Sequence, residues 1–295
     1  MPRSFVGSAT VVAALALVPS MAVAQAPAAA PASSWGEIAG SVAAMTDYTF
    51  RGVSQTTKGP AVQGTLEYTK ELGPVTGYVG TFLSNVAIPD TSSRGNLDAK
   101  VEVDLAFGLR GDVNEKLKWD VGYIRYMYPF TDYPKANSMS LDWTEVGVKL
   151  TYDLGFATPV LNYFHSPNYS VGGGKSHYGQ TGFDVPLPWY DITLGARIGR
   201  LVVANNANFG LPDYTDWSIG ISRDFPELLG VNIGLTYTDT NVKKNAPLSN
   251  KSDTTTGNVD ERVFDTTQPR IILRGFNTPV HRDLGASEGV KNLLR

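Results

Sequence analysis

The sequence predicts an all-β fold, a transmembrane antiparallel up-and-down β-barrel of about twelve strands. Three observations predict this fold class. One long stretch alternates apolar with charged or small residues, an even number of segments can be interpreted as strands, and the connections between these segments alternate between long and short.

The clearest alternation runs from Leu97 to Arg110. Its odd-numbered residues are apolar or small, and its even-numbered residues are charged or small. Because successive side chains of a strand point to opposite faces, this stretch forms a ribbon with one oily and one ionic face. A strand needs about ten residues to cross a bilayer at a tilt, so this stretch is long enough.

The N-terminal residues 1–24 are predicted to be an export signal peptide. Arg3 precedes an apolar run, and Ala22-Val23-Ala24 matches the small-x-small cleavage pattern. A membrane anchor is the alternative, but the apolar run is short and Pro19 interrupts it. Residues 25–34 are rich in Ala and Pro and are predicted to be a linker that precedes a barrel domain over residues 35–276.

The composition excludes several classes of function. The chain has no cysteine, which excludes disulfides, thiolate metal sites and thiol nucleophiles. Its 25 basic and 28 acidic residues give a net charge of −3, and this mild acidity argues against a nucleic-acid partner. After the signal, no apolar run has the length of a membrane-spanning helix.

The predicted strands follow one another along the chain with connections of alternating length. Alternation and turn residues define twelve segments: 37–50, 61–71, 76–86, 96–110, 116–128, 141–153, 158–166, 176–186, 190–201, 214–224, 230–240 and 260–276. Long polar connections such as 51–60, 167–175 and 241–259 alternate with compact turns such as Leu72-Gly73-Pro74. Bacterial outer-membrane barrels make this pattern, with short periplasmic turns and longer outer loops.

The phase of each strand then assigns its side chains to a face. The residues expected to line a pore are Glu67, Asp98, Lys100, Glu102, Asp104, Asp120, Glu145, Lys149 and Arg197. The residues expected to face lipid are Val101, Val103, Leu105, Phe107, Val146, Val148, Leu150, Ile219, Ile221, Ile233 and Leu235. The pore-lining charges form either a constriction that selects solutes by charge or a salt-bridge network that plugs a small lumen.

Aromatic residues near the strand ends predict two girdles at the membrane surfaces. Tyr48 and Phe50 fall on the lipid-facing phase of the first strand. The outer girdle is expected to contain Tyr48, Tyr128, Phe130, Trp143, Tyr214 and Tyr237. Arg125 and His165 also fall on the outer phase, so either a bulge shifts the register there or these side chains reach along the surface to the membrane interface.

The segment Asp47-Tyr48-Thr49-Phe50-Arg51-Gly52-Val53-Ser54-Gln55 resembles a family known as TorF-like porins, a Gram-negative outer-membrane β-barrel family of unassigned role. The likeness continues over residues 40–240 and includes Ser166-Pro167-Asn168-Tyr169 and 218–225. It implies an outer-membrane barrel that acts as a channel, and it supplies no catalytic residues.

The C-terminus departs from the pattern of such barrels, which end on an aromatic residue that the barrel-assembly machinery reads. Phe276 is the candidate for this residue, and 277–295 are expected to be a disordered extension. Gln268-Pro269 interrupts the last predicted strand, and proline cannot donate to a ladder, so closure through this strand is the least supported part of the prediction.

The remaining polar candidates do not suggest catalysis, a metal site or a cofactor. His165 and His177 flank a glycine run, so a hairpin brings them together, but two imidazoles lack a third metal ligand nearby in the sequence. His165 and Ser166 cannot act together as a hydrolase pair, because adjacent residues of a strand point to opposite faces. No enzymatic activity is expected.

The sequence therefore predicts a porin-like channel of a Gram-negative outer membrane that passes small hydrophilic solutes. Its expected partners are outer-membrane lipid, the barrel-assembly machinery and, in a homo-oligomer, further copies of the chain. Two alternatives stay open. One is a non-conducting structural or partner-binding barrel of the same membrane, and the other is a soluble periplasmic β-sandwich or ligand-binding barrel.

Overall fold

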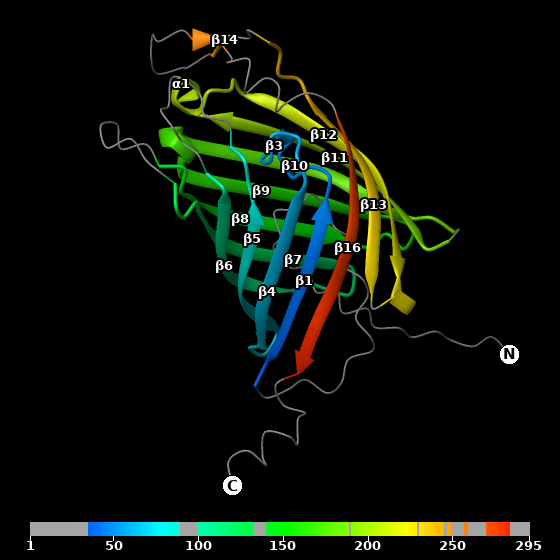
Figure 1. Cartoon of the computed structure of the whole chain (residues 1–295). Coiled ribbons are helices and arrows are strands. Elements are labelled where there is room, and N and C mark those ends of the chain that lie inside the picture. Colours follow the sequence, from blue (N-terminus) through cyan, green and yellow to red (C-terminus); the bar gives the residue numbers. More distant parts are fainter. Residues whose placement is uncertain are drawn as a thin grey trace, which may run out of the picture.

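Twelve strands form one closed antiparallel barrel in the structure, a computed structural model of the whole chain (Figure 1). The structure describes residues 35–88, 99–131, 140–188, 190–228 and 230–244, together with the backbone of 247–248, 257–258 and 270–283. The predicted fold class is confirmed. The signal peptide and the linker predicted for residues 1–34 lie outside the described residues.

The barrel strands occupy nearly the segments that alternation predicted. They are β1 (Glu37–Met45), β4 (Ala61–Glu71), β5 (Val75–Asn85), β6 (Val101–Asp112), β7 (Leu117–Met127), β8 (Trp143–Tyr152), β9 (Thr158–Tyr169), β10 (Gly174–Pro186), β11 (Ile192–Val203), β12 (Tyr214–Phe225), β13 (Val231–Thr240) and β16 (Arg270–Asp283). The connections contain the remaining elements, which are β2 (Thr49–Phe50), β3 (Val53–Ser54), η1 (Ser170–Gly172), α1 (Asn206–Phe209), η2 (Pro226–Leu228), β14 (Pro247–Leu248) and β15 (Gly257–Asn258).

Each barrel strand pairs with its neighbours in the chain, and β16 closes the ring between β13 and β1 (Figure 1). Glu37 lies opposite Asp283, and Val42 lies opposite Thr278. The last strand therefore begins at Arg270 rather than at residue 260, and it continues past Phe276. The predicted boundary at Phe276 lies inside this strand, because pairing with β1 extends the ladder to Asp283.

The connections alternate in length as the sequence predicts, with one exception. We name the end of the barrel that carries the connections after β1, β5, β7, β9, β11 and β13 the loop end, and the opposite end the turn end. The predicted long connection 167–175 is wrong, because β9 extends to Tyr169, β10 begins at Gly174 and the single turn η1 joins them.

The outer face of the barrel is apolar. Eight of the residues expected to face lipid are exposed there: Leu105, Phe107, Val146, Val148, Ile219, Ile221, Ile233 and Leu235. Val101, Val103 and Leu150 lie on the same phase and are half-buried. No helix in the described part of the chain is both long and apolar enough to cross a bilayer.

Arg125 lies on this outer face without any irregularity of the strands beside it. The registers of β6 with β7 and of β7 with β8 run through Arg125 without a shift, so the alternative of a bulge is wrong there. The Arg125 guanidinium reaches Asp142 at 3.3 Å near the loop end. It therefore extends along the surface, as a long cationic side chain at a membrane interface does.

The inside of the barrel is packed most tightly at the loop end. Interior residues near that end, such as Met45, Ala61, Tyr126 and Leu201, are buried. Interior residues toward the turn end, among them Ala39, Thr65, Arg110 and Asp184, are only half-buried. The barrel is thus closed by side chains at the loop end and more accessible to water at the turn end.

Candidate functional site

The connection between β1 and β4, residues 46–60, folds into the loop end of the barrel. Its short strands β2 and β3 pair as a hairpin, with Thr49 opposite Ser54 and Phe50 opposite Val53. We name residues 46–60 the plug. Its tip is Arg51-Gly52, and both residues have positive φ, 49° and 75°. Two such residues make the type I′ turn that suits a two-residue hairpin, with glycine in its second position.

Three polar side chains give the plug a fixed shape. The Asp47 carboxylate accepts hydrogen bonds from the Ser54 hydroxyl at 2.5 Å and from the Thr56 hydroxyl at 2.9 Å. The Thr56 hydroxyl oxygen also accepts from the Tyr48 backbone N–H at 3.1 Å. These residues are buried, so the bonds replace the water that the polar groups lose. The local motif therefore encodes its own compact turn before it contacts the barrel wall.

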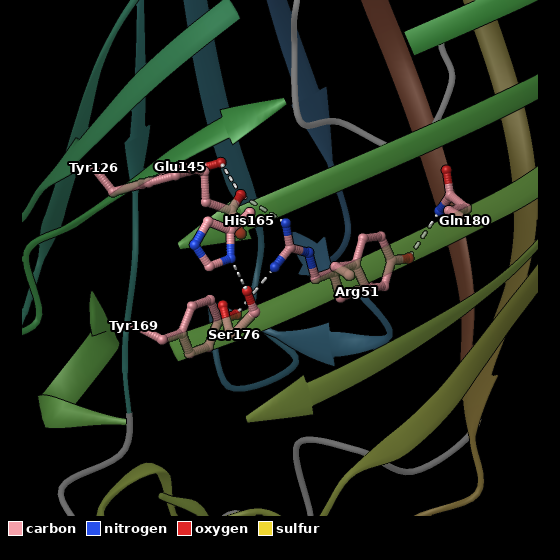
Figure 2. A network of polar contacts seen from close by, with 8 residues as sticks. Arg51, Tyr126, Glu145, His165, Tyr169, Ser176 and Gln180 are labelled. Carbon is pink, nitrogen blue, oxygen red and sulfur yellow. Dashed lines mark hydrogen bonds and ion pairs between the residues drawn. The ribbon is translucent and has the colours of Figure 1, made fainter. Parts of the chain in front are cut away.

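Arg51 ties the tip of the plug to the far wall of the barrel. Its Nη2 atom lies 2.7 Å from Glu145 Oε2 on β8, and its Nη1 atom donates to the Tyr169 hydroxyl on β9 at 3.4 Å (Figure 2). The side chain of Arg51 is 3% exposed and that of Glu145 is 0% exposed. The Tyr126 hydroxyl donates to the same Glu145 oxygen at 3.3 Å. An ion pair this well buried is costly to break, because one charge would be left without compensation.

The Arg51 guanidinium is positively charged in this setting. Burial by itself lowers the pKa of Arg51, while the charge of Glu145 and the Tyr169 side chain raise it. The net result is a pKa above the ordinary value for arginine. The plug therefore carries a full positive charge into the interior of the barrel.

Aromatic rings seal the plug against the wall. Phe50 meets the rings of Tyr126 and Trp143 edge-on, with centroids 6.0 and 6.1 Å away. Tyr126 and Trp143 stack on each other with centroids 3.8 Å apart. The Tyr214 hydroxyl donates to the backbone carbonyl of Arg51 at 3.0 Å. Ring contacts of this kind add to the apolar area that they bury, so the plug is bound by packing as well as by charge.

Tyr48 joins the plug to β6. Its hydroxyl donates to Glu102 Oε1 at 3.3 Å. Burial, followed by the charges of Glu102 and Asp104, raises the pKa of Tyr48 well above its ordinary value. The phenol therefore keeps its proton and acts as the donor in this contact.

These contacts correct the prediction for the outer aromatic girdle. Tyr48, Tyr128, Trp143 and Tyr214 are buried at the loop end. Tyr48 and Phe50 do not continue the first strand, because β1 ends at Met45 and the chain turns inward. Of the predicted outer girdle, Phe130 and Tyr237 are exposed.

The half of the interior nearer the turn end carries charged pairs built from the strands themselves. Arg110 on β6 lies 2.8 Å from Glu67 on β4, and Arg197 on β11 lies 2.6 Å from Asp184 on β10. The Tyr78 hydroxyl donates to Asp120 at 2.8 Å. These pairs join adjacent or next-adjacent strands along the wall, so the charges partly compensate one another there. The arrangement combines features of the charged constriction and of the salt-bridge network that the sequence left as alternatives.

The structure brings most of the predicted pore-lining residues to the interior. Five carboxylates are buried there, namely Glu67, Glu102, Asp104, Asp120 and Glu145. Arg197 is buried and Lys149 is half-buried on the inward phase. Lys100 is exposed just before β6, so it does not line the enclosed interior, and Asp98 lies outside the described residues.

The set of pore-lining residues expected from the sequence does not include Arg51, Arg110 or Asp184, although Arg110 falls on the ionic face of the stretch 97–110. Arg110 and Asp184 lie on the inward phase of their strands, so alternation alone contained the signal for them. Arg51 lies in a connection, where strand phase assigns no face. The only signal for it is local, since Arg51-Gly52 fits a tight hairpin turn within the segment that resembles the TorF-like family.

His165 and His177 face outward, away from the plug. They lie opposite each other on β9 and β10 with ring centroids 4.7 Å apart, as the hairpin predicts. The Tyr163 hydroxyl lies 2.7 Å from His177 Nδ1. Ser166 is buried on the other face of β9. Among the described residues, no group of three His, Cys, Asp or Glu side chains is placed to hold a metal ion.

A match to a protein-family model shows the family of this chain. The model, described as a bacterial protein of unknown function (Gcw_chp), matches residues 28–267. The chain belongs to the Gcw_chp family. The match contains the plug and every barrel strand except β16. The Gcw_chp description does not include the TorF-like name, which therefore stays an expectation from the resemblance.

No curated protein matches this Gcw_chp chain. Similar solved structures include the KdgM porin, with a TM-score of 0.44, 5% identity, and coverage of 84% of this chain and 99% of that one. The P. putida toluene transporter TodX has a TM-score of 0.39, 10% identity, and coverage of 85% and 89%. LpxR from Salmonella typhimurium has a TM-score of 0.39, 8% identity, and coverage of 83% and 99%.

Proposed function

We propose that this chain is a porin-like channel of a Gram-negative outer membrane, and that the plug closes its loop end. The observation that carries the proposal is a closed barrel whose outward phase is apolar and whose inward phase is polar and charged. Lipid suits the outward side chains and water suits the inward ones. The proposal is not an enzymatic one. Residues 1–24 act in it as the export signal, and outer-membrane lipid surrounds the barrel.

The width of the barrel supports a narrow path for small hydrophilic solutes. About eight strands leave a lumen that side chains fill, and about sixteen leave an aqueous channel. Twelve strands lie between these limits. In such a barrel an inward loop decides whether the lumen conducts, and the plug occupies that position here. Opening then requires the plug to leave the wall at Arg51 and Tyr48.

Removing the tip of the plug tests this proposal. Gln55 donates its backbone N–H to the Tyr48 carbonyl at 2.7 Å, so these two residues already lie side by side. Replacing residues 49–54 by Asn-Gly leaves that pair joined by a two-residue turn. We expect the shortened variant to show larger or more frequent single-channel steps in planar bilayers than the unmodified protein. Lys58→Ala, an exposed change in the same connection, serves as the control.

A specific observation favours the rival function, a non-conducting structural or partner-binding barrel. The plug is held by a buried ion pair and several rings, which is stronger than a transient closure needs. Absence of any conductance step in the shortened variant, when the folded barrel still changes its gel mobility on heating, would establish this rival. A barrel found in the soluble fraction without detergent would contradict both membrane functions.

The buried carboxylates near the plug predict the charge preference of the open channel. Glu102 and Asp104 lie next to each other on the inward face of β6. Neutralising both in the shortened variant, as Glu102→Gln with Asp104→Asn, is expected to lower its preference for cations and to move the reversal potential in a salt gradient toward zero. Glu71→Gln with Glu115→Gln removes two exposed charges at the turn end and provides the matched control. An unchanged reversal potential would favour a purely structural role for Glu102 and Asp104.

A further inference from the structure

We propose that the wall around Glu145 is a binding site for the guanidinium or ammonium group of a cationic solute, and that Arg51 occupies this site while the plug is closed. The inference rests on the proposed function, since the solute reaches the wall through the lumen. It adds the substrate class, small organic cations, which neither the family description nor the neighbours supply.

Four aromatic rings of the barrel wall surround the Arg51 guanidinium. Its Cζ atom lies 4.2 Å from the ring centroid of Tyr178 on β10, 5.5 Å from Phe164 and 5.9 Å from Tyr169 on β9, and 5.8 Å from Trp143 on β8. A fifth ring, Phe50, belongs to the plug and lies 4.6 Å away. Several ring faces around one cation form the arrangement by which proteins recognise ammonium and guanidinium groups.

One buried carboxylate completes the cage. Glu145 Oε2 lies 2.7 Å from Arg51 Nη2, and within the described residues Glu145 Oε1 has no hydrogen-bond partner. Glu145 is fully buried. When Arg51 leaves, this carboxylate needs either another cation or a proton, because an isolated buried charge is unfavourable. The wall by itself is therefore a cation site, and the plug only fills it.

The cation comes from a removable element, while the cage comes from the rigid wall. Arg51 stands in the left-handed backbone region at φ 49°, which is unfavourable for a residue other than glycine. The cage residues lie on three neighbouring strands of the wall, β8, β9 and β10, and Phe164 stands directly opposite Tyr178 in the ladder between β9 and β10. Withdrawal of the plug therefore exposes a preformed site instead of dismantling it.

Two other interior arginines show what an ordinary wall ion pair looks like in this barrel. Arg110 pairs with Glu67 and has one described ring beside it, Tyr78 at 5.2 Å. Arg197 pairs with Asp184, and no aromatic ring of the described residues lies against its guanidinium. Both arginines belong to the strands, so they cannot withdraw. Only the Glu145 site, among these three, combines a carboxylate with a cage of rings and a cation from a loop.

Binding of a small cation to the emptied cage tests the inference without any measurement of current. We expect Arg51→Ala in detergent micelles to bind ethylguanidinium saturably, with a change in tryptophan fluorescence because Trp143 is part of the cage. The affinity should be at least tenfold higher than for the unmodified protein, in which Arg51 fills the site. Ethylurea at the same concentrations serves as the neutral isostere and should not give a saturable signal.

Two variants separate the cage from general attraction of cations. Arg51→Ala with Glu145→Gln should weaken ethylguanidinium binding at least tenfold, because a neutral amide replaces the carboxylate. Arg197→Ala leaves Asp184 without its arginine but has no cage, so it should not show the saturable signal. If Arg51→Ala does not fold, the variant with residues 49–54 replaced by Asn-Gly removes the same guanidinium.

The outcomes are distinct for the two proposals. Failure of ethylguanidinium to bind a folded variant without Arg51, or equal binding after Glu145→Gln or by Arg197→Ala, overturns the cation site and assigns Arg51 a structural role. Saturable binding together with a barrel that never conducts keeps the cation site and ends the channel proposal. Conductance without ethylguanidinium binding keeps the channel proposal and overturns the cation site.

Discussion

Two adjacent residues, Arg51 and Gly52, decide how the plug meets the barrel. The turn needs positive φ at both positions, and Gly52 approaches the wall so closely that an added Cβ would lie 2.5 Å from Thr240 Cγ2 and 2.9 Å from Asp216 Cβ. Arg51 accepts an unfavourable backbone conformation, and its ion pair with Glu145 offsets that cost. At the tip of the plug, an unfavourable backbone conformation and a stabilising ion pair therefore act against each other.

Gly52→Ala is expected to displace the tip of the plug. The substitution adds the cost of a left-handed alanine, about 1–2 kcal/mol, and a clash with β12 and β13. Gly73→Ala is the matched control, because Gly73 has φ +78° and no atom within 4 Å of an added Cβ. Thermal unfolding in micelles should show a larger loss of stability for Gly52→Ala than for Gly73→Ala. Equal losses would mean that the contact with the wall does not matter.

At the residue scale, the sequence predicts side chains on strands well and side chains in connections poorly. Glu102, Asp104 and Glu145 follow from alternation, because each strand has only two faces. Tyr48 and Phe50 receive the wrong face, because continuing the phase of β1 past Met45 ignores the inward turn. Contacts such as that between Arg51 and Glu145 join residues 94 positions apart, and no local pattern contains them.

At the scale of elements, long strands with one oily face are the easiest to predict. β6 (Val101–Asp112) keeps a strict period of two, and a compact turn follows its last residue. β16 is the exception, since the proline that interrupts the predicted strand stands directly before its first residue, Arg270. Inside β16, Pro279 lies opposite Ser41, close to the register shift between Val42 and Ala44. Proline is tolerated beside such irregularities, but the sequence does not show where they occur.

A charge placed on the outer face of β8 tests whether that face meets lipid. Val148 lies in the middle of the strand and Tyr152 at its turn end, and both are exposed on the outer face. Arginine costs about 2–4 kcal/mol at the middle of a bilayer and about 0–1 kcal/mol near its surface. We therefore expect Val148→Arg to lower the free energy of unfolding in lipid vesicles far more than Tyr152→Arg. Similar values for both variants would argue against a membrane around this face.

At the scale of the whole molecule, stability and function depend on closure of the ring. A closed barrel leaves no strand edge exposed, which a membrane requires of any sheet that it surrounds. Here β16 provides the closure by pairing with both β1 and β13. The interior can hold charged groups such as Glu67 and Arg110 only because the ring separates them from the lipid side. The length of the last strand therefore matters for every site inside.

Shortening the chain tests this closure directly. Of the eight register pairs between β1 and β16, the six from Glu37↔Asp283 to Val42↔Thr278 lie beyond Phe276. A chain that ends at Phe276 keeps only the pairs of Ala44 and Met45 with β16, so most of β1 loses its partner on that side. We expect this variant to lose the change in gel mobility on heating that marks a closed barrel, whereas a chain that ends at Asp283 keeps it. If the chain ending at Phe276 still folds into a heat-modifiable form, the barrel closes without the second half of β16, and the strand boundary that alternation predicted is the functional one.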